Sequence, residues 1–311
     1  CKPVLRVAVF IPTTLRASLI STLESLEGQT FKDFETVLIV KGERPNLPYR
    51  VIVQKGGLFE EAMNLALRAV EEMDVDIALF TDDDTVPSRT WVEEHLRFHE
   101  RNRDFAVASG TVIGKKWKNY PNSLFRRFKG TKFMEPLPGL EGYTDFVTKV
   151  GLSVDGGSVN GMQSVAIVGA NMSLKAEPFY GFRLPTYSIR GSYNETLLAL
   201  RAITKGYKSG KFGGAEVRHL DGETLSRTSD PEVERFICME KHAFPFAVNR
   251  IVRLDVELLA EFVELIPESV QRLGLELALR GIKEGYSDLR FREELERIKI
   301  RNLECLWTES L

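Results

Sequence analysis

The chain has 311 residues, of which 43% are hydrophobic and 28% are charged, the ordinary balance of a soluble globular protein. A chain of this length buries roughly 75% of its unfolded surface, enough for one large domain or about two smaller ones. The formal net charge of −2 argues against a general attraction to nucleic acid or to an anionic membrane, so only local basic patches could serve such partners.

The first part of the chain, up to Lys115, alternates short β-rich runs with segments of helical period. This pattern predicts parallel strands joined by crossover helices. We expect strands at residues 4–11, 35–40, 50–54 and 76–80, and helices at residues 18–28 and after the Gly56-Gly57 pair. Because open α/β sheets bind ligands at the carboxyl ends of their strands, the residues after these strands are the first candidates for a site.

Three adjacent carboxylates, Asp82, Asp83 and Asp84, follow the last of these strands. In an extended stretch, Asp82 and Asp84 project to one side while Asp83 points away. Mg²⁺ or Mn²⁺ needs only one or two protein carboxylates when a substrate diphosphate completes its shell. For an isolated acidic triplet, a solvated turn that caps the next helix is the favoured interpretation. The position directly after a buried strand favours the metal site.

Between Lys115 and Gly161 the alternation stops. The stretch "KKWKNYPNSLFRRFKG" mixes basic and aromatic residues without a clear period, and we expect the segment rich in Gly and Pro after it to be an insertion or a mobile loop. The basic and aromatic stretch suits a phosphate-bearing lipid or a membrane surface, and it equally suits a flexible loop whose long side chains reach into solvent. Single-stranded nucleic acid is a weaker third interpretation.

A second ordered block follows, with a strand and turn at residues 164–174, a helix at 193–208 and a strand at 214–220. After Ser229 the chain has the amphipathic pattern of helices. Ser192 and Glu195 match the S-x-x-E capping box at the start of the helix. The Glu195 carboxylate also has the chemistry of a general base, although these residues alone favour the cap.

The histidines give little indication of a site by themselves. His95 and His99 are four residues apart, but Leu96 stands where the zinc motif H-E-x-x-H requires glutamate, so we expect a solvated helix face. Neither a dinucleotide-binding G-x-G-x-x-G nor a P-loop is present, and Gly56 and Gly57 are a weak indication of a phosphate-binding turn.

The cysteines Cys1, Cys238 and Cys305 show no CxxC spacing, so we expect neither a disulfide framework nor a thiolate metal site, and a reducing compartment. No apolar run reaches the roughly 18 residues of a membrane span. We therefore expect a cytoplasmic protein, or one at the cytoplasmic face of the membrane.

Several motifs in order resemble the family 2 glycosyltransferases of the GT-A fold, from about Val4 to Leu220. They are "FIPTTLRASLISTLESLEGQTFKDFETVLIV", "MNLAL", "FTDDDTVPSRTWVEEH", "VGANMSL", "NETLLALRAITKGYK" and "EVRHL". The resemblance implies an α/β fold with a mostly parallel sheet, a catalytic domain over residues 1–229 and a helical extension over residues 230–311.

The resemblance also implies roles for single residues. In that family an aspartate cluster holds a divalent metal on a nucleotide-sugar diphosphate, and a carboxylate at the start of the late helix is the base. Carried over, Glu195 is the base and Asp82, Asp84 and His219 are metal ligands. The residues assigned to the donor nucleotide are Pro12, Thr13, Thr14, Arg16, Lys41, Gly57, Asn64, Asp82 and Asp83.

The implied activity is an inverting transfer of one sugar from a nucleotide-diphosphate sugar to an acceptor hydroxyl, with Mn²⁺ or Mg²⁺. A glycan or a lipid-linked molecule is the expected acceptor, with peripheral membrane contact and no nucleic acid as partner. Lys41 and Asn194 depart from residues common in the family. A sugar-phosphate nucleotidyltransferase is one alternative, although "PTTLRASL" lacks the glycine-rich loop it needs. A catalytically silent glycan-binding or scaffold protein is the other.

Overall fold

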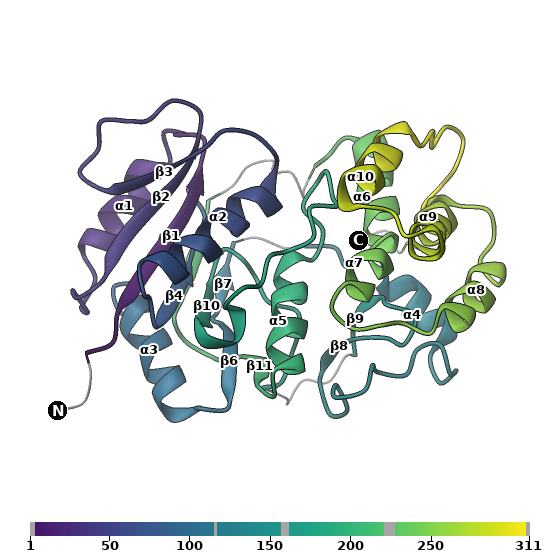
Figure 1. The fold of residues 1–311 in the computed structure, drawn as a ribbon, viewed down its shortest axis with the longest axis horizontal. Coiled ribbons are helices and arrows are strands. Elements are labelled where there is room, and N and C mark those ends of the chain that lie inside the picture. Colours follow the sequence, from purple (N-terminus) through teal and green to yellow (C-terminus); the bar gives the residue numbers. More distant parts are fainter. Residues whose placement is uncertain (1–3, 115–116, 157–161, 221–227, 309–311) are drawn as a thin grey trace. The chain divides into compact units, whose positions relative to one another are not determined.

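The structure is a computed structural model that describes residues 4–114, 117–156, 162–220 and 228–308 (Figure 1). The chain folds into two compact units that interleave along the sequence, and each is described by itself. Unit 1 consists of Cys1–Lys116, Ile167–Leu184 and Arg201–Gly222, and unit 2 consists of Trp117–Ala166, Pro185–Leu200 and Glu223–Leu311. The division into domains at residue 229 stays a prediction.

Unit 1 is built on a seven-stranded sheet with the order β11-β6-β10-β4-β1-β2-β3 among the described residues. Neighbouring strands are parallel except for β10, which is antiparallel to both β4 and β6. The strands are β1 (Val7–Thr13), β2 (Glu35–Lys41), β3 (Arg50–Gln54), β4 (Ile77–Phe80), β6 (Phe105–Ser109), β10 (Met172–Lys175) and β11 (Lys208–Lys211). The predicted fold class, an α/β fold with a mostly parallel sheet flanked by helices, is confirmed.

Helices cover both faces of this sheet. The helix α1 (Leu19–Glu27) buries Leu19, Leu23 and Leu26, which recur at helical spacing and pack against Val9 of β1. The helix α3 (Trp91–Arg101) joins the same apolar cluster through Trp91.

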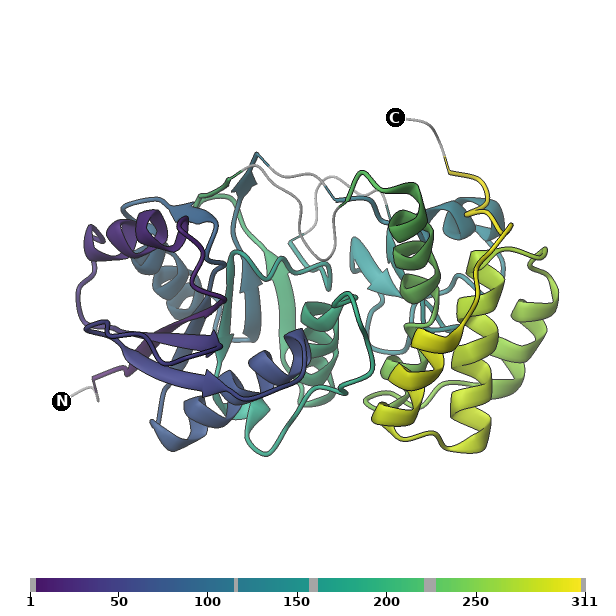
Figure 2. The same cartoon turned by 90° about the horizontal axis from the view of Figure 1, so that it is seen from above.

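The opposite face is covered by α2 (Phe59–Glu72), which contacts β1, β2 and β3. Figure 2 shows α1 and α2 on opposite sides of the strands. Burial on both faces explains why β1 and β4 are continuous apolar runs rather than alternating ones.

A smaller sheet in unit 1 pairs β12 (Val217–His219) with β5 (Thr85–Pro87) and with β7 (Val112–Ile113). The β12–β5 pairing is antiparallel and sets His219 opposite Thr85. Because Thr85 follows Asp84 directly, this register brings the end of β12 to the turn that contains Asp82, Asp83 and Asp84, the acidic turn. A short 3₁₀ helix, η1 (Glu177–Phe179), also belongs to this unit.

Unit 2 is mostly helical. Its elements are α4 (Asn122–Phe128), β8 (Asp145–Val147), β9 (Ser153–Asp155), α6 (Pro231–His242), α7 (Pro245–Asn249), α8 (Val256–Glu264), α9 (Val270–Glu284), α10 (Asp288–Arg297) and the start of α5 (Asn194–Thr204). The close approach of α6 and α9 depends on Gly274, because a Cβ there would lie 2.2 Å from the Met239 carbonyl oxygen. No described helix has both the length and the apolar character that crossing a membrane requires.

The expectation of a mobile loop between Lys115 and Gly161 is wrong for the part that the structure describes. That part contains α4 and the β8–β9 pair, and Phe125 is buried. The Arg127 guanidinium lies 4.4 Å from the centre of the Trp307 ring, so the basic and aromatic residues take part in packing. Lys115, Lys116 and Gly161 themselves lie outside the described residues.

The expectation that the cysteines form no disulfide is also wrong. Cys238 of α6 is joined to Cys305, with the two Cα atoms 6.4 Å apart across a sequence separation of 67 residues. This pairing depends on where the C-terminal segment returns to α6, which no local spacing reveals. The cysteines therefore no longer support a reducing compartment. Cys1 lies outside the described residues.

Candidate functional site

The acidic turn lies at the carboxyl end of β4, where the sequence predicts it. Threonine hydroxyls build the turn. The Thr85 Oγ1 donates to the Asp82 carbonyl at 2.8 Å, and the Thr22 Oγ1 of α1 donates to the Thr85 carbonyl at 2.6 Å. The Thr81 Oγ1 donates to the Ala170 carbonyl at 2.8 Å. The positions of the three aspartates are therefore fixed by buried hydrogen bonds to their neighbours.

Asp83 is held by one residue at the end of β1, the parallel neighbour of β4, and by another that follows it. Its carboxylate accepts a hydrogen bond from the Thr13 Oγ1 at 2.8 Å and another from the Arg16 Nε at 3.1 Å. Arg16 also lies 3.4 Å from Asp84, and its hydrogen bond to Asp83 raises the pKa of the guanidinium. Pro12 lies at the end of the same strand, and Thr14 is exposed beside it. Thr13 and Arg16 thus compensate one carboxylate of the triplet directly.

Asp82 and Asp84 face His219 instead. The His219 Nε2 lies 3.7 Å from the Asp82 carboxylate and 3.5 Å from the Asp84 carboxylate, and one ligand atom from each of the three residues lies within 4.8 Å of the others. The alternation predicted for the triplet is thus present, with Asp83 turned away. Burial, together with the charge of Asp82, raises the pKa of the Asp84 carboxyl.

The hydrogen bonds of His219 orient its ring for a metal. The Nδ1 lies 3.0 Å from the Leu220 carbonyl oxygen, which can only accept, so Nδ1 carries a proton and Nε2 is the ring nitrogen that faces the two carboxylates. The Leu220 amide in turn donates to the Asp84 carbonyl at 2.8 Å. Two carboxylates and the Nε2 of an imidazole form a donor set that fits a divalent cation such as Mn²⁺.

The other residues assigned to the nucleotide already have protein partners. The Lys41 Nζ at the end of β2 donates to the Gly57 carbonyl at 2.6 Å. The Asn64 side chain of α2 binds both backbone groups of Leu184, donating to its carbonyl at 3.0 Å and accepting from its amide at 2.7 Å. Both contacts fix backbone close to α2, so neither side chain joins the acidic turn.

Glu195 lies in unit 2, in the first turn of α5, with its side chain partly buried. The helix begins at Asn194, so Tyr193 rather than Ser192 precedes the first helical residue. The Ser192 hydroxyl donates to Glu240 at 2.6 Å. The capping box suggested by the sequence therefore lacks its capping serine, and the role of Glu195 as base stays a prediction.

The expectation that His95 and His99 form a solvated helix face is wrong, because both are buried. His95 lies 2.7 Å from the Ser173 hydroxyl and 2.7 Å from the Asn171 Oδ1, which also accepts from the Trp91 indole. His99 contacts the same Ser173 hydroxyl at 2.8 Å. Burial lowers the pKa of His95 to about 4 and that of His99 to about 3, so both are neutral near pH 7.

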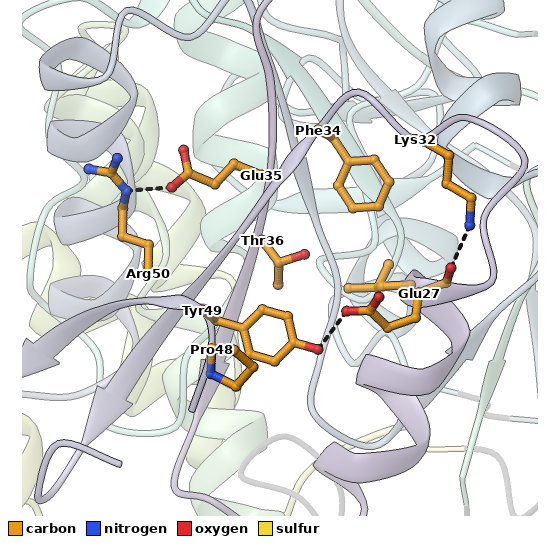
Figure 3. Close-up of a pocket in the computed structure, with 9 residues that line it drawn as sticks. Glu27, Lys32, Phe34, Glu35, Thr36, Pro48, Tyr49 and Arg50 are labelled. Atoms are coloured by element: carbon orange, nitrogen blue, oxygen red, sulfur yellow. Dashed lines mark hydrogen bonds and ion pairs between the residues drawn. The ribbon is translucent and has the colours of Figure 1, made fainter. Parts of the chain in front are cut away.

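A pocket of about 330 Å³ lies at the amino ends of β2 and β3, away from the acidic turn (Figure 3). Its polar groups are paired with one another. Arg50 binds Glu35 at 2.7 Å, the Tyr49 hydroxyl donates to Glu27 at 2.8 Å, and Lys32 donates to the Glu27 carbonyl at 2.6 Å. Ligands of parallel sheets bind at the carboxyl ends of strands, so this pocket is not the donor site.

Solved structures similar to the chain include a mannosyltransferase, PcManGT from Pyrobaculum calidifontis, in complex with GDP-Man and Mn²⁺. It is 14% identical over 94% of this chain and 78% of that one, with a TM-score of 0.49. S. aureus TarS is 15% identical over 94% and 55%, with a TM-score of 0.47. Its 1–349 fragment in complex with UDP-GlcNAc is 14% identical over 94% and 90%, also with a TM-score of 0.47.

The curated proteins contain no match to the chain. The model of glycosyl transferase family 2 matches residues 8–153. The matched segment begins in β1 and contains Thr13, Arg16 and the three aspartates, which the structure brings together at one edge of the sheet. Residues 8–153 of the chain are therefore similar to glycosyl transferase family 2.

Proposed function

We propose that the chain is a metal-dependent inverting glycosyltransferase, which moves one sugar from a nucleotide-diphosphate sugar to an acceptor hydroxyl. The observation that carries the proposal is that the three aspartates of the acidic turn contact two different sets of partners. Asp82 and Asp84 converge with the His219 Nε2, whereas Asp83 is bound by Thr13 and Arg16. One side of the turn is thus suited to a cation and the other to a fixed contact with the donor.

Asp82, Asp84 and His219 are the residues that would hold the cation. When bound, Mn²⁺ or Mg²⁺ supplies positive charge to the departing nucleotide diphosphate. The imidazole in the donor set favours Mn²⁺ over Mg²⁺, because Mg²⁺ prefers oxygen ligands. Arg16 contributes a permanent positive charge beside the same carboxylates.

Glu195 is the proposed general base. As a carboxylate it would take the proton from the acceptor hydroxyl, whose oxygen then attacks the anomeric carbon from the face opposite the leaving diphosphate. Attack from that face inverts the configuration of the sugar. The position of Glu195 in the first turn of α5 agrees with the place of the base in the family that the sequence resembles.

Glu195→Gln tests this role. The amide keeps the size of the side chain but accepts no proton, so kcat for sugar transfer should fall about 10²- to 10⁴-fold while donor affinity stays unchanged. Glu257→Gln, at an exposed position in the first turn of α8, is the matched control and should transfer normally. Normal kcat in Glu195→Gln would refute the assignment of the base.

A panel of nucleotide sugars, with and without Mn²⁺, tests the reaction itself. Metal-dependent release of nucleoside diphosphate together with a glycosylated acceptor supports the transferase. Pyrophosphate release from a nucleoside triphosphate and a sugar phosphate would support the nucleotidyltransferase instead. Binding of glycans without turnover of any donor would support the silent scaffold protein.

The acceptor is proposed to be a glycan or a lipid-linked molecule. The basic residues of α4 motivate the lipid, since Arg126 and Arg127 are both exposed. Their aromatic neighbour Phe125 is buried, so the apolar part of such a contact is smaller than the sequence indicates. Arg126→Gln should raise the KM for a lipid-diphosphate acceptor and leave donor hydrolysis unchanged. An unchanged KM would remove the support for the lipid.

A further inference from the structure

Helix α6 carries a buried carboxylate, Glu240, which no part of the proposed reaction uses. It is 0% exposed and accepts hydrogen bonds from the Ile189 amide at 2.8 Å, the Ser192 hydroxyl at 2.6 Å and the Arg190 amide at 3.1 Å. A buried charge is costly unless hydrogen bonds compensate it. Here the compensation comes from one segment, residues 189–192, through which the chain enters α5.

The next residue on α6, Lys241, contacts the last residue before α5. Its Nζ lies 4.0 Å from the centre of the Tyr193 ring, a cation–π distance. Tyr193 also packs edge-on against Phe244, with ring centres 5.1 Å apart, and its hydroxyl donates to Asn119. These three contacts hold the Tyr193 ring in place from α6, from the residue directly before α7 and from the segment before α4.

The backbone at this point is strained. Tyr193 has φ +54°, in the left-handed region that residues other than glycine rarely adopt. Asn194, the first residue of α5, is 0% exposed, and neither polar atom of its side-chain amide has a hydrogen-bond partner among the residues that the structure describes. Strain and an unpartnered buried amide persist only where surrounding contacts impose them, and they are typical of functional segments.

The charges in this region alternate in sign. Burial lowers the pKa of Lys241 to about 8, while the charges of Glu240 on its own helix and Glu195 on α5 act in the opposite direction. Burial raises the pKa of Tyr193 and of Tyr120, so both phenols stay neutral near pH 7. A positive charge between two carboxylates favours the ionised form of each.

We propose that Glu240 and Lys241 are positioning residues for Glu195. Glu240 fixes the segment that leads into α5, and Lys241 fixes Tyr193, the residue before α5, and carries a positive charge that acts on the Glu195 carboxylate. The inference deepens the proposed function and rests on it, because an ionised and oriented Glu195 is what a general base requires.

The first test does not depend on a measurement of glycosyltransferase activity. The side-chain carboxyl carbons of glutamate are labelled with ¹³C in the full-length protein, and the signal of Glu195 is identified by its loss in Glu195→Gln. In Lys241→Met the midpoint of the Glu195 titration should rise by about one pH unit or more, because an opposite charge has been removed. Lys241→Arg keeps the charge and should titrate as the wild type does. Lys283→Met removes an exposed lysine of α9 and is the control for net charge.

The second test separates positioning from mere stability. Ser192→Ala removes one of the three hydrogen bonds to Glu240 and leaves every charge in place. If Glu240 positions the segment, kcat for transfer should fall several-fold with the donor KM unchanged. In Lys241→Met the acidic limb of the kcat profile should move to higher pH, by the same amount as the Glu195 titration.

The outcomes also separate this inference from the proposed function. A Glu195 midpoint that is equal in Lys241→Met and in the wild type overturns the role of Lys241. A kcat unchanged by Ser192→Ala overturns the role of Glu240. If the Glu195 midpoint moves in Lys241→Met and not in Lys241→Arg, the electrostatic part stands, even where no donor is turned over and the proposed function fails.

Discussion

Acidification should destabilise the protein through its buried histidines, and His99 offers the sharpest test. The Asn171 Oδ1 only accepts, so the His95 Nε2 carries the proton and the His95 Nδ1 accepts from the Ser173 hydroxyl. The oxygen of that hydroxyl then accepts from the His99 Nε2. The chain of hydrogen bonds is complete only when His95 is neutral, because a proton on the His95 Nδ1 would face the proton of Ser173.

The sign and size follow from the pKa values. The pKa of His99 falls from 6.5 to about 3 on folding, so at pH 5 the unfolded chain holds a proton that the folded chain does not. Stability is therefore lost as the pH falls below 6.5. Between pH 7.5 and pH 5 each such histidine lowers the free energy of unfolding by about 2 kcal/mol. His242, buried with a pKa of about 4, adds to His95 and His99, for about 6 kcal/mol together.

Urea unfolding at pH 7.5 and at pH 5, in the wild type and in His99→Gln, measures this. Glutamine places its amide NH₂ where the His99 Nε2–H lies and does not titrate, so the loss on acidification should be smaller by about 2 kcal/mol in the variant. The raised pKa values of Asp84 and Glu240 act in the opposite direction, but they are common to both proteins and cancel in the difference. An equal loss in both proteins would refute the argument.

Three further predictions concern metal binding, the disulfide and helix packing. In the wild type, Mn²⁺ at 100 times its Kd should add about 2.7 kcal/mol to the free energy of unfolding, whereas the Asp84→Asn variant, which lacks a charged ligand, should be stabilised far less by the same Mn²⁺ concentration. Equal stabilisation of the two proteins in thermal unfolding would contradict the ligand assignment. Cys238→Ser should lower the free energy of unfolding in urea by about 4 kcal/mol, because the disulfide closes a loop of 67 residues, and a reductant should have no further effect on the variant. Gly274→Ala should lower it by about 1–3 kcal/mol, since its Cβ would meet the Met239 carbonyl, whereas Gly213→Ala, with nothing within 4 Å, should be neutral; equal stability of the two would contradict the packing argument.

The features that the sequence predicted correctly are local ones. Strands β1 and β4 could be predicted because a run buried on both faces is continuously apolar, and α1 because its leucines recur at helical spacing. The opposite directions of Asp83 and its two neighbours agree with the alternation predicted for the triplet, although the structure places Asp83 and Asp84 in a turn rather than in an extended stretch.

The errors come from partners that are distant in the sequence. Ser192 matches a capping box, but its hydroxyl donates a hydrogen bond to Glu240, 48 residues later in the sequence. His95 and His99 are polar, yet both are buried, and their rings form hydrogen bonds with the hydroxyl of Ser173, more than 70 residues away in the sequence. The disulfide has the same origin, with 67 residues between its cysteines. A local pattern cannot show which of several partners a polar side chain will meet once the chain has folded.

The charges of the acidic turn bear on the order of binding. Among the described residues, Arg16 is the permanent cation that pairs with these carboxylates, and it binds Asp83 most closely. With all three aspartates ionised, the turn and Arg16 together carry two negative charges. A nucleotide diphosphate adds negative charge of its own, so in the absence of metal it meets repulsion at this edge of the sheet. A divalent cation held by Asp82, Asp84 and His219 brings the turn to neutrality, and only then does the attraction of Arg16 for the diphosphate act without that repulsion. If the proposed function is correct, the metal therefore binds before the donor or together with it.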